Sequence, residues 1–269
     1  MTDKQIAMDQ AVALVHSGDI VGLGGMTIYR RPVAFVRQLI DRSQPPTDLT
    51  LLAFTGGLAA DMLVGAGLVR RTRTCYFGLE IFGLAPMFTR AATTGELEIV
   101  EESEASIASG LRAQMAGVGF MPSRAWQGTD MFTARPDVKS IADPYTGRRL
   151  TAFPAIACDV AVIHVLRADR RGNCVLGGNP TIDLELATVA KRVIITAESV
   201  ERQLTEAVDI PGLAVTAVVE APRGAWPTSC YPLYPLDGEE ILRYIAYCND
   251  GAFTTYLASA VAPAQEAAQ

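Results

Sequence analysis

The chain has 269 residues, of which 49% are apolar and 19% charged, and its formal net charge at pH 7 is −6. That composition is typical of a globular protein with a large core, and the acidic balance gives no support to nucleic-acid binding. No apolar run is long enough to span a bilayer, and the polar start at Met1–Ala7 is unlike a signal peptide. We therefore expect a cytoplasmic protein that engages neither nucleic acid nor membrane.

Strands and helices alternate along the chain. Ile20–Leu23 is predicted as a buried strand, followed by the pair Gly24-Gly25 and by a helix whose first turn contains Pro32. Further strands are expected at Leu49–Phe54, Thr74–Phe77, Leu97–Val100, Leu150–Pro154, Asp159–Leu166, Val193–Ala197 and Leu213–Val219. Further helices are expected at Ile6–His16, Leu58–Ala66, Met87–Ala92, Glu104–Met115, Asp183–Lys191, Val200–Glu206 and Gly238–Tyr247. This alternation predicts an α/β fold with an open, mostly parallel sheet and helices on both faces.

Residues 123–149 interrupt the alternation, because they carry little hydrophobic periodicity and contain scattered Pro, Gly and Asp. We interpret them as a long irregular connection, and connections of that length are usually functional or mobile. The strand–helix pattern resumes beyond them. The sequence therefore predicts one α/β domain over residues 1–269.

The glycine pair is the first candidate site. In open α/β sheets ligands bind beyond the carboxyl ends of strands, and glycine lets a ligand approach the bare N–H groups. Gly22, Gly24 and Gly25 do not complete GxGxxG, because position 27 is threonine, and no P-loop motif is present. Alone, the pattern favours a tight strand-to-helix turn, and the neighbouring Arg30–Arg31 pair favours a solvated face over an anion site.

The titratable residues give few catalytic patterns. His164 falls within an apolar strand, which favours a buried, hydrogen-bonded side chain over a catalytic base. The five cysteines show no CxxC and no zinc-ligand spacing with histidine, so we expect no metal site and a reducing compartment. Ser103 is predicted as a helix N-cap, and Glu104 then suits the helix dipole. Held in a dry cleft, Glu104 or Glu80 would instead serve as a nucleophile or base.

Five segments in the same order resemble the α subunit of family I coenzyme A-transferases, in particular the glutaconate CoA-transferase type. They are HSGDIVGLGGMTIYRRPVAFVRQL, TGGLAADMLVGAG, GLRAQMAGVGFMP, CDVAVIHVLRADRRGN and DIPGLAVTAVVEAPRGAWPTSCYPLY. The resemblance covers nearly the whole chain. The chain departs from the family at Gly119, where proline is common, and by being shorter at its C-terminal end.

The resemblance implies an enzyme that moves CoA from an acyl-CoA to a free carboxylic acid, through an acyl-glutamyl anhydride and a glutamyl-CoA thioester. It implies no metal or bound cofactor, with the coenzyme A thioester as substrate. The nucleophilic glutamate belongs to a homologous β subunit, in a heterodimer or in a heterotetramer of two α and two β chains. This chain would then wall the acyl site with backbone donors near the glycine pair. The substrate-binding residues implied are Gly24, Gly25, Met26, Glu80, Gln127 and Gly128.

Two other functions stay open at this stage. Glu104 stands where transferase α chains often carry glutamine, whereas a related pair of steroid-ring-opening CoA hydrolases has glutamate at the matching place as the presumed base. A non-catalytic ligand-binding or scaffolding subunit on the same fold is the third interpretation. The candidate loops contain both apolar and polar residues, so the sequence is compatible with short dicarboxylates and with bulkier acyl groups; these residues are Ile28, Tyr29, Phe82 and Gln127.

Overall fold

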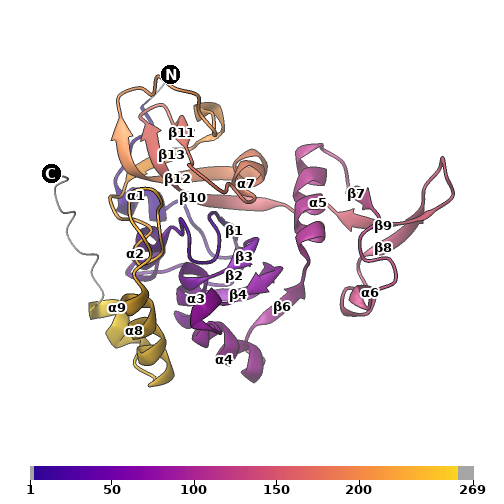
Figure 1. Cartoon of the computed structure of the whole chain (residues 1–269), viewed down its shortest axis with the longest axis horizontal. Coiled ribbons are helices and arrows are strands. Elements are labelled where there is room, and N and C mark those ends of the chain that lie inside the picture. The colour runs from indigo at the N-terminus through magenta and orange to yellow at the C-terminus, as the bar shows by residue number, and fades with distance from the viewer. Residues whose placement is uncertain (1–2, 260–269) are drawn as a thin grey trace.

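The computed structural model describes residues 3–259 and is built around an eight-stranded sheet (Figure 1). Its strands follow the order β13 (Ala217–Glu220), β12 (Ala190–Glu201), β10 (Cys158–Asp169), β1 (Ile20–Leu23), β2 (Leu49–Leu52), β4 (Val69–Thr74) and β6 (Glu98–Glu101). These neighbours are all parallel, and β11 (Cys174–Val175) adds an antiparallel strand beside β10. The mostly parallel α/β sheet predicted from the sequence is confirmed.

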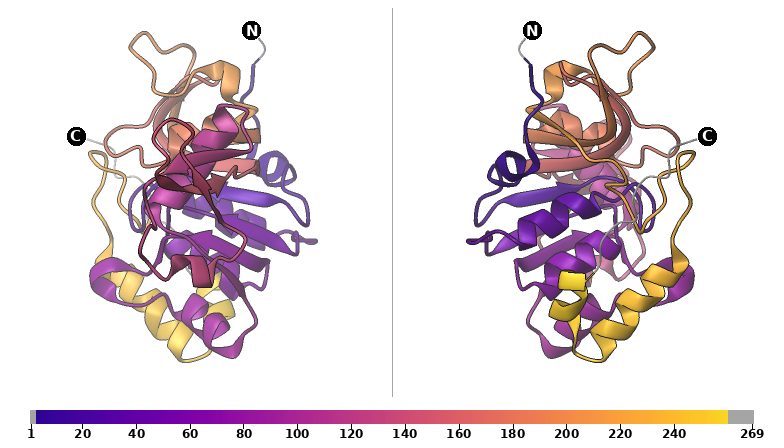
Figure 2. Two further views of the ribbon diagram at one scale, coloured as in Figure 1. Left: turned by 90° about the vertical axis from the view of Figure 1, so that its right-hand side faces the viewer. Right: turned by 90° about the vertical axis from the view of Figure 1, so that its left-hand side faces the viewer.

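Helices cover both faces of this sheet (Figure 2). One face packs against α1 (Met8–Val12), α2 (Val33–Ile40), α3 (Leu58–Gly65), α4 (Pro86–Thr94), α8 (Gly238–Asn249) and α9 (Phe253–Ser259). The other face packs against α5 (Glu104–Met115) and α7 (Asp183–Val189). Because side chains alternate along a strand, Val21 and Leu23 enter the first core, whereas Gly22 faces Leu186 of α7. Among the described helices, none is both long and apolar enough to cross a membrane.

The strand order reverses next to β1. From β1 the chain proceeds through β2, β4 and β6 to one edge, and it then returns to β10 on the other side of β1. The carboxyl ends of β1 and β10 therefore flank the place where the connections diverge. In open parallel sheets that crevice is where ligands bind.

A small projecting arm replaces the irregular connection expected over residues 123–149. It consists of an antiparallel sheet in the order β7 (Phe120–Ser123), β9 (Arg149–Pro154) and β8 (Lys139–Ala142), with the short helix α6 (Met131–Ala134). Figure 1 shows it extending from the body beyond α5. The expectation of an irregular connection was wrong where α6 and β8 form, because these elements have only 4 residues each and show no clear periodicity.

Other boundaries also differ from the predictions. The helix expected at Val200–Glu206 does not form, because β12 continues to Glu201 and pairs with β10 up to Asp169. The strand expected at Thr74–Phe77 is divided between the end of β4 and β5 (Tyr76–Phe77), which pairs with β3 (Thr55–Gly56). Short 3₁₀ turns, η1 (Glu80–Phe82) and η2 (Gly212–Ala214), complete the connections. The alanine-rich segment Ala252–Gln269 was expected to fray at its end, and residues 260–269 lie outside the described residues.

Candidate functional site

An open cleft of about 530 Å³ lies beyond the carboxyl end of β1, where the strand order reverses. We call it the β1 cleft. Of the residues proposed from the sequence, it brings together Met26 and Glu80, which are 54 positions apart in the chain. Its full lining is Met26, Thr27, Ile28, Tyr29, Glu80, Gly178, Asn179 and Tyr231.

The floor of the cleft is a tight turn at Met26–Tyr29. The Met26 N–H donates to the Tyr29 carbonyl at 2.8 Å, and the Tyr29 N–H donates to the Met26 carbonyl at 2.6 Å. Thr27 is tied to β3, because its N–H and its hydroxyl both donate to Thr55 Oγ1, at 2.9 and 3.1 Å. A Cβ on Gly57 would lie 1.8 Å from the Thr27 carbonyl oxygen. The turn is therefore seated on β3 only because position 57 is glycine.

The N–H groups of the glycine pair do not face the cleft as free donors, which corrects the sequence-based expectation. The Gly24 N–H donates to the Val162 carbonyl of β10 at 2.9 Å. The Gly25 N–H donates to Asp183 Oδ1, also at 2.9 Å. The position expected for a ligand anion is thus occupied by a carboxylate of the chain itself. Gly24 and Gly25 support the cleft from behind.

The charge of that carboxylate is balanced within the protein. Arg30 Nη2 lies 2.7 Å from Asp183 Oδ2, and both side chains are fully buried. The same guanidinium donates to the carbonyls of His164 at 2.7 Å and Asn179 at 2.9 Å. Arg31 is also fully buried, and burial lowers its pKa to about 10. The solvated face expected for Arg30–Arg31 was wrong, because both guanidinium groups are buried and Asp183, distant in sequence, pairs directly with Arg30.

Backbone strain is concentrated around the cleft. Three of its lining residues that are not glycine, Thr27, Glu80 and Asn179, have positive φ angles of 36°, 56° and 46°. Arg30 (51°) and Thr181 (46°), which flank them, do as well. Such conformations cost about 1–3 kcal/mol each and tend to gather at functional sites. We take this concentration as independent support for the β1 cleft as the candidate site.

Glu104 lies at the first position of α5, at the same edge of the sheet. The predicted cap is confirmed, because Ser103 Oγ accepts from the Ser106 N–H at 3.2 Å. Glu104 is exposed, and its carboxylate has no hydrogen bond or ion pair to residues 3–259. Strand β6 is three strands from β1, which places Glu104 on the order of 14 Å along the edge from the β1 cleft.

A second carboxylate, Glu102, lies beside Glu104 and was not singled out as a site residue from the sequence. The Glu102 side chain is only 1% exposed and is held by Arg73 Nε at 3.0 Å and Arg135 Nη1 at 2.8 Å. Arg135 also forms a two-point ion pair with Asp137 at 2.8 Å, so it anchors the arm to the end of β6. The sequence offered Arg73 of β4 as one possible partner for Glu102. The second partner, Arg135, could not be predicted because the arm itself was not predicted.

Gln127 and Gly128 are not brought into the β1 cleft. They lie in the arm, where Gln127 Nε2 donates to Thr151 Oγ1 of β9 at 2.8 Å. The adjacent Trp126 Nε1 donates to Ser103 Oγ at 2.7 Å, which places this loop beside the first turn of α5. The structure therefore associates Gln127 with Glu104 rather than with Met26 and Glu80.

A buried polar network stabilises the loop that forms another side of the cleft. His164 Nε2 lies 2.8 Å from Glu198 Oε1, which also accepts the Tyr234 hydroxyl, while Glu198 Oε2 accepts the Arg223 N–H at 2.6 Å. The prediction of a buried, hydrogen-bonded His164 is confirmed. The fold also brings Cys230 near, so three side chains of metal-ligating type meet where the sequence predicted none. His164 and Glu198 are hydrogen-bonded to each other, and burial raises the pKa of Cys230 to about 12.

This network is connected to the floor of the cleft through the backbone. The Ser229 N–H donates to the Ile28 carbonyl at 3.0 Å, and the Arg30 N–H donates to the Ser229 carbonyl at 2.8 Å. The segment from Arg223 to Tyr234 is thus clamped by Glu198 at both ends and paired with the turn in its middle. Tyr231, on this segment, is positioned over the cleft as a consequence.

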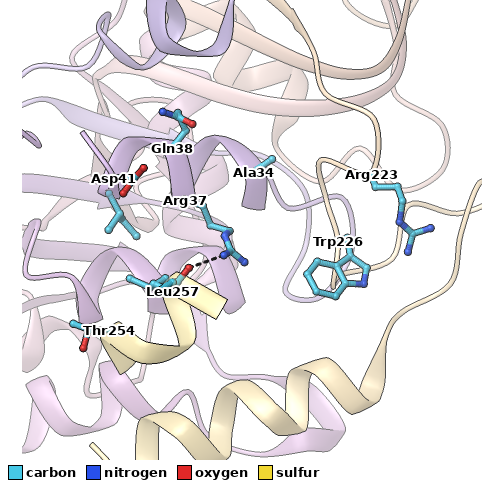
Figure 3. Close-up of a pocket in the computed structure, with 10 residues that line it drawn as sticks. Ala34, Arg37, Gln38, Asp41, Arg223, Trp226, Thr254 and Leu257 are labelled. Carbon is cyan, nitrogen blue, oxygen red and sulfur yellow. Dashed lines mark hydrogen bonds between the residues drawn. The ribbon is translucent and has the colours of Figure 1, made fainter. Parts of the chain in front are cut away.

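A separate cavity of about 590 Å³ lies between α2, α9 and the loop at Arg223–Trp226. Figure 3 shows its lining side chains and the hydrogen bond from Arg37 to the Leu257 carbonyl, which is 2.8 Å long. None of the residues proposed from the sequence lines it. We therefore assign the candidate site to the β1 cleft.

Comparisons with known proteins agree with the resemblance seen in the sequence. A family model described as coenzyme A transferase matches residues 5–221. The chain is 34% identical over 229 residues to one of the subunits of 3-oxoadipate CoA-transferase from Pseudomonas knackmussii, covering 83% of this chain and 80% of that protein. It is 34% identical over 262 residues to the cholesterol ring-cleaving hydrolase IpdA subunit of Rhodococcus jostii, covering 91% of this chain and 86% of that protein.

Solved structures show the same fold. A variant of the decarboxylase AibA/AibB superposes with a TM-score of 0.89 at 32% identity, covering 96% of this chain and 98% of that one. Glutaconate coenzyme A-transferase from Acidaminococcus fermentans superposes with a TM-score of 0.83 at 30% identity, covering 95% and 92%. An uncharacterised relative from Archaeoglobus fulgidus is longer, and the chain spans 56% of it at 35% identity.

Proposed function

Because this chain belongs to the coenzyme A transferase family, we propose that it is the α subunit of a heteromeric CoA-transferase whose nucleophilic glutamate lies on a β subunit. The β1 cleft forms this chain's half of the acyl site. The assembly is a heterodimer or a heterotetramer of two α and two β chains. The need for a partner is supported by the relatives whose names describe them as single subunits of CoA-transferases.

One observation carries this assignment: the β1 cleft, at about 530 Å³, is large enough for an acyl group, but none of its lining side chains is an activated nucleophile. Its single carboxylate, Glu80, is exposed and has no hydrogen-bonded or ion-paired partner among residues 3–259. The nearby thiol of Cys230 is buried, and its pKa is raised to about 12. His164 is committed to Glu198. These features support a nucleophile supplied by a partner chain.

The chemistry proceeds in balanced exchanges on the partner's glutamate. Its carboxylate attacks the thioester carbonyl, which releases CoA thiolate and leaves an acyl-glutamyl anhydride. The thiolate attacks the glutamyl carbonyl, which frees the donor acid and leaves a glutamyl-CoA thioester. The acceptor carboxylate then displaces the thiolate to form a new anhydride. Attack of the thiolate on the new acyl carbon yields the product acyl-CoA and regenerates the glutamate. No metal or bound cofactor enters these steps.

Intact-mass spectrometry of the co-purified complex tests the assignment. After incubation with acyl-CoA, we expect a CoA adduct on the β chain and none on this chain, and we expect no transfer by this chain alone. A CoA adduct on this chain, or a full rate of transfer without the partner, would contradict the two-subunit proposal.

The unpaired Glu104 carboxylate favours one alternative, a subunit of a CoA-ester hydrolase or ring-opening enzyme in which Glu104 is the base. The similarity to the IpdA subunit points the same way. In that case Glu104→Gln in the assembled enzyme abolishes water-dependent turnover. In the transferase as proposed, we expect the same variant to keep near-normal CoA exchange, because the nucleophile is the partner's glutamate. The two outcomes separate the functions.

A further inference from the structure

The charge of the β1 cleft is unusual for an enzyme that handles dicarboxylic acids. Half of its lining residues are the apolar or aromatic Met26, Ile28, Tyr29 and Tyr231, and its one charged side chain is Glu80. No lysine or arginine is among the lining residues. The Thr27 hydroxyl, a further polar group, already donates to Thr55 Oγ1.

The two arginines nearest in sequence are not available to a substrate anion. Arg30 is fully buried, and its guanidinium is shared among Asp183 and the carbonyls of His164 and Asn179. Arg31 is inaccessible because it is fully buried; its Nη1 donates to the Gly25 carbonyl at 3.1 Å, and its Nε and Nη2 have no hydrogen-bond partner among residues 3–259. Both lie behind the turn at Met26–Tyr29. A carboxylate in the cleft would therefore meet Glu80 without a compensating cation from this chain.

The rim of the cleft extends its apolar character. Ile81 is 88% exposed and Leu84 is 70% exposed, and both follow Glu80 in the same loop. Across the opening, Tyr231 is 72% exposed. The rim of the cleft of about 530 Å³ is therefore apolar, as is most of its lining surface.

We propose that the acyl group handled by this enzyme is apolar and lacks a second carboxylate, and that Glu80 selects against dicarboxylic acids. The inference rests on the proposed function, because it names the acyl class of the same site. It separates this chain from its similar relatives, since 3-oxoadipate and glutaconate, which appear in their names, are dicarboxylates.

A matched pair of acceptor acids tests the proposal. Octanoate and suberate have eight carbons each and differ by the terminal carboxylate. With acetyl-CoA as donor and the complex of this chain with its β subunit, we expect kcat/KM to be at least about tenfold higher for octanoate. The preference should decrease as salt is added, because Glu80 is exposed and its field is screened. Equal or better use of suberate would overturn the proposal.

Substitution of Glu80 assigns the effect to one residue. In Glu80→Gln we expect the octanoate preference to fall severalfold, mainly through a lower KM for suberate. The control is Glu96→Gln, which removes another exposed carboxylate, outside the cleft, and should leave the preference unchanged. An unchanged preference in Glu80→Gln, or an equal change in Glu96→Gln, would contradict the role of Glu80.

Calorimetric binding of octanoyl-CoA and suberyl-CoA separates this inference from the proposed function. If the complex transfers CoA but prefers suberate, the acyl class is wrong and the transferase assignment stands. If no acid accepts CoA while octanoyl-CoA binds more tightly than suberyl-CoA, the transferase assignment is wrong and the acyl class stands. Binding of neither thioester would overturn the acyl class as well.

Discussion

The carboxylate of Asp183 lies against the N–H of Gly25, with Oδ1 at 2.9 Å from the nitrogen. A Cβ on the preceding Gly24 would stand 2.7 Å from the same oxygen. The glycine pair therefore admits an internal anion in the position where many α/β proteins admit a ligand anion. This contact holds the β1 cleft in place from beneath.

Loss of the Asp183 charge should destabilise the fold strongly. Asp183→Asn leaves the Arg30 guanidinium buried without a counter-charge, and breaking a buried pair from one side costs about 3–5 kcal/mol. Urea unfolding of the wild type and the variant measures the difference. The control Glu96→Gln should stay within about 0.5 kcal/mol of wild type. A similarly small change in Asp183→Asn would show that the pair does not support the site.

Addition of a methyl group at position 57 should displace the cleft floor. The new Cβ of Gly57→Ala would lie 1.8 Å from the Thr27 carbonyl oxygen, so the turn must move. We expect a raised KM for acyl-CoA and a loss of stability of about 1–3 kcal/mol. Gly119→Ala is the matched control, because a Cβ at that position would have no heavy atom within 4 Å and the φ of Gly119 is not positive. Equal kinetics in both variants would contradict the contact.

The Glu198 network should make the protein sensitive to acid. Burial by itself raises the pKa of Glu198, but hydrogen bonds from His164 and Tyr234 outweigh it and hold this pKa below the ordinary 4.5. The stability contributed is present above pH 4.5 and is lost as the pH falls through the lower folded pKa. In Glu198→Gln we expect weaker binding of acyl-CoA and a smaller decrease in unfolding free energy below pH 4.5. If the unfolding free energy of Glu198→Gln decreased with falling pH as steeply as that of the wild type, Glu198 would not be the source of the acid sensitivity.

The cysteines should be unreactive in the native protein. Burial raises the pKa of Cys75 to about 11, and Cys158, Cys174, Cys230 and Cys248 are buried more deeply. At pH 8 about one thousandth of the Cys75 thiol is ionised. Iodoacetamide should therefore modify the folded protein slowly, with Cys75 first by peptide mapping, and CoA transfer should persist. Rapid inactivation at pH 8 would indicate a catalytic thiol that the geometry does not support.

Local sequence signals determined the fold class and several elements of this protein. The bounds of β1 at Ile20–Leu23 and of α5 at Glu104–Met115, with Ser103 as its cap, follow from apolar periodicity and capping chemistry within a few residues. The parallel sheet followed from the alternation of strands and helices. These features depend on neighbours in the chain, which a single sequence displays.

Only the tertiary structure decided which groups meet at the site. Asp183 accepts a hydrogen bond from the Gly25 N–H, although the two residues are 158 positions apart in the chain. The other oxygen of the same carboxylate forms a buried ion pair with Arg30, which the sequence had placed on a solvated face. Val200 belongs to strand β12 because it pairs with Ala168 of β10, although its local sequence pattern predicted a helix. Burial, charge compensation and strand pairing depend on partners brought together by folding. For that reason the sequence could point to part of the cleft lining, such as Met26 and Glu80, whereas the buried Arg30–Asp183 pair behind it and the contribution of Tyr231 appear only in the fold.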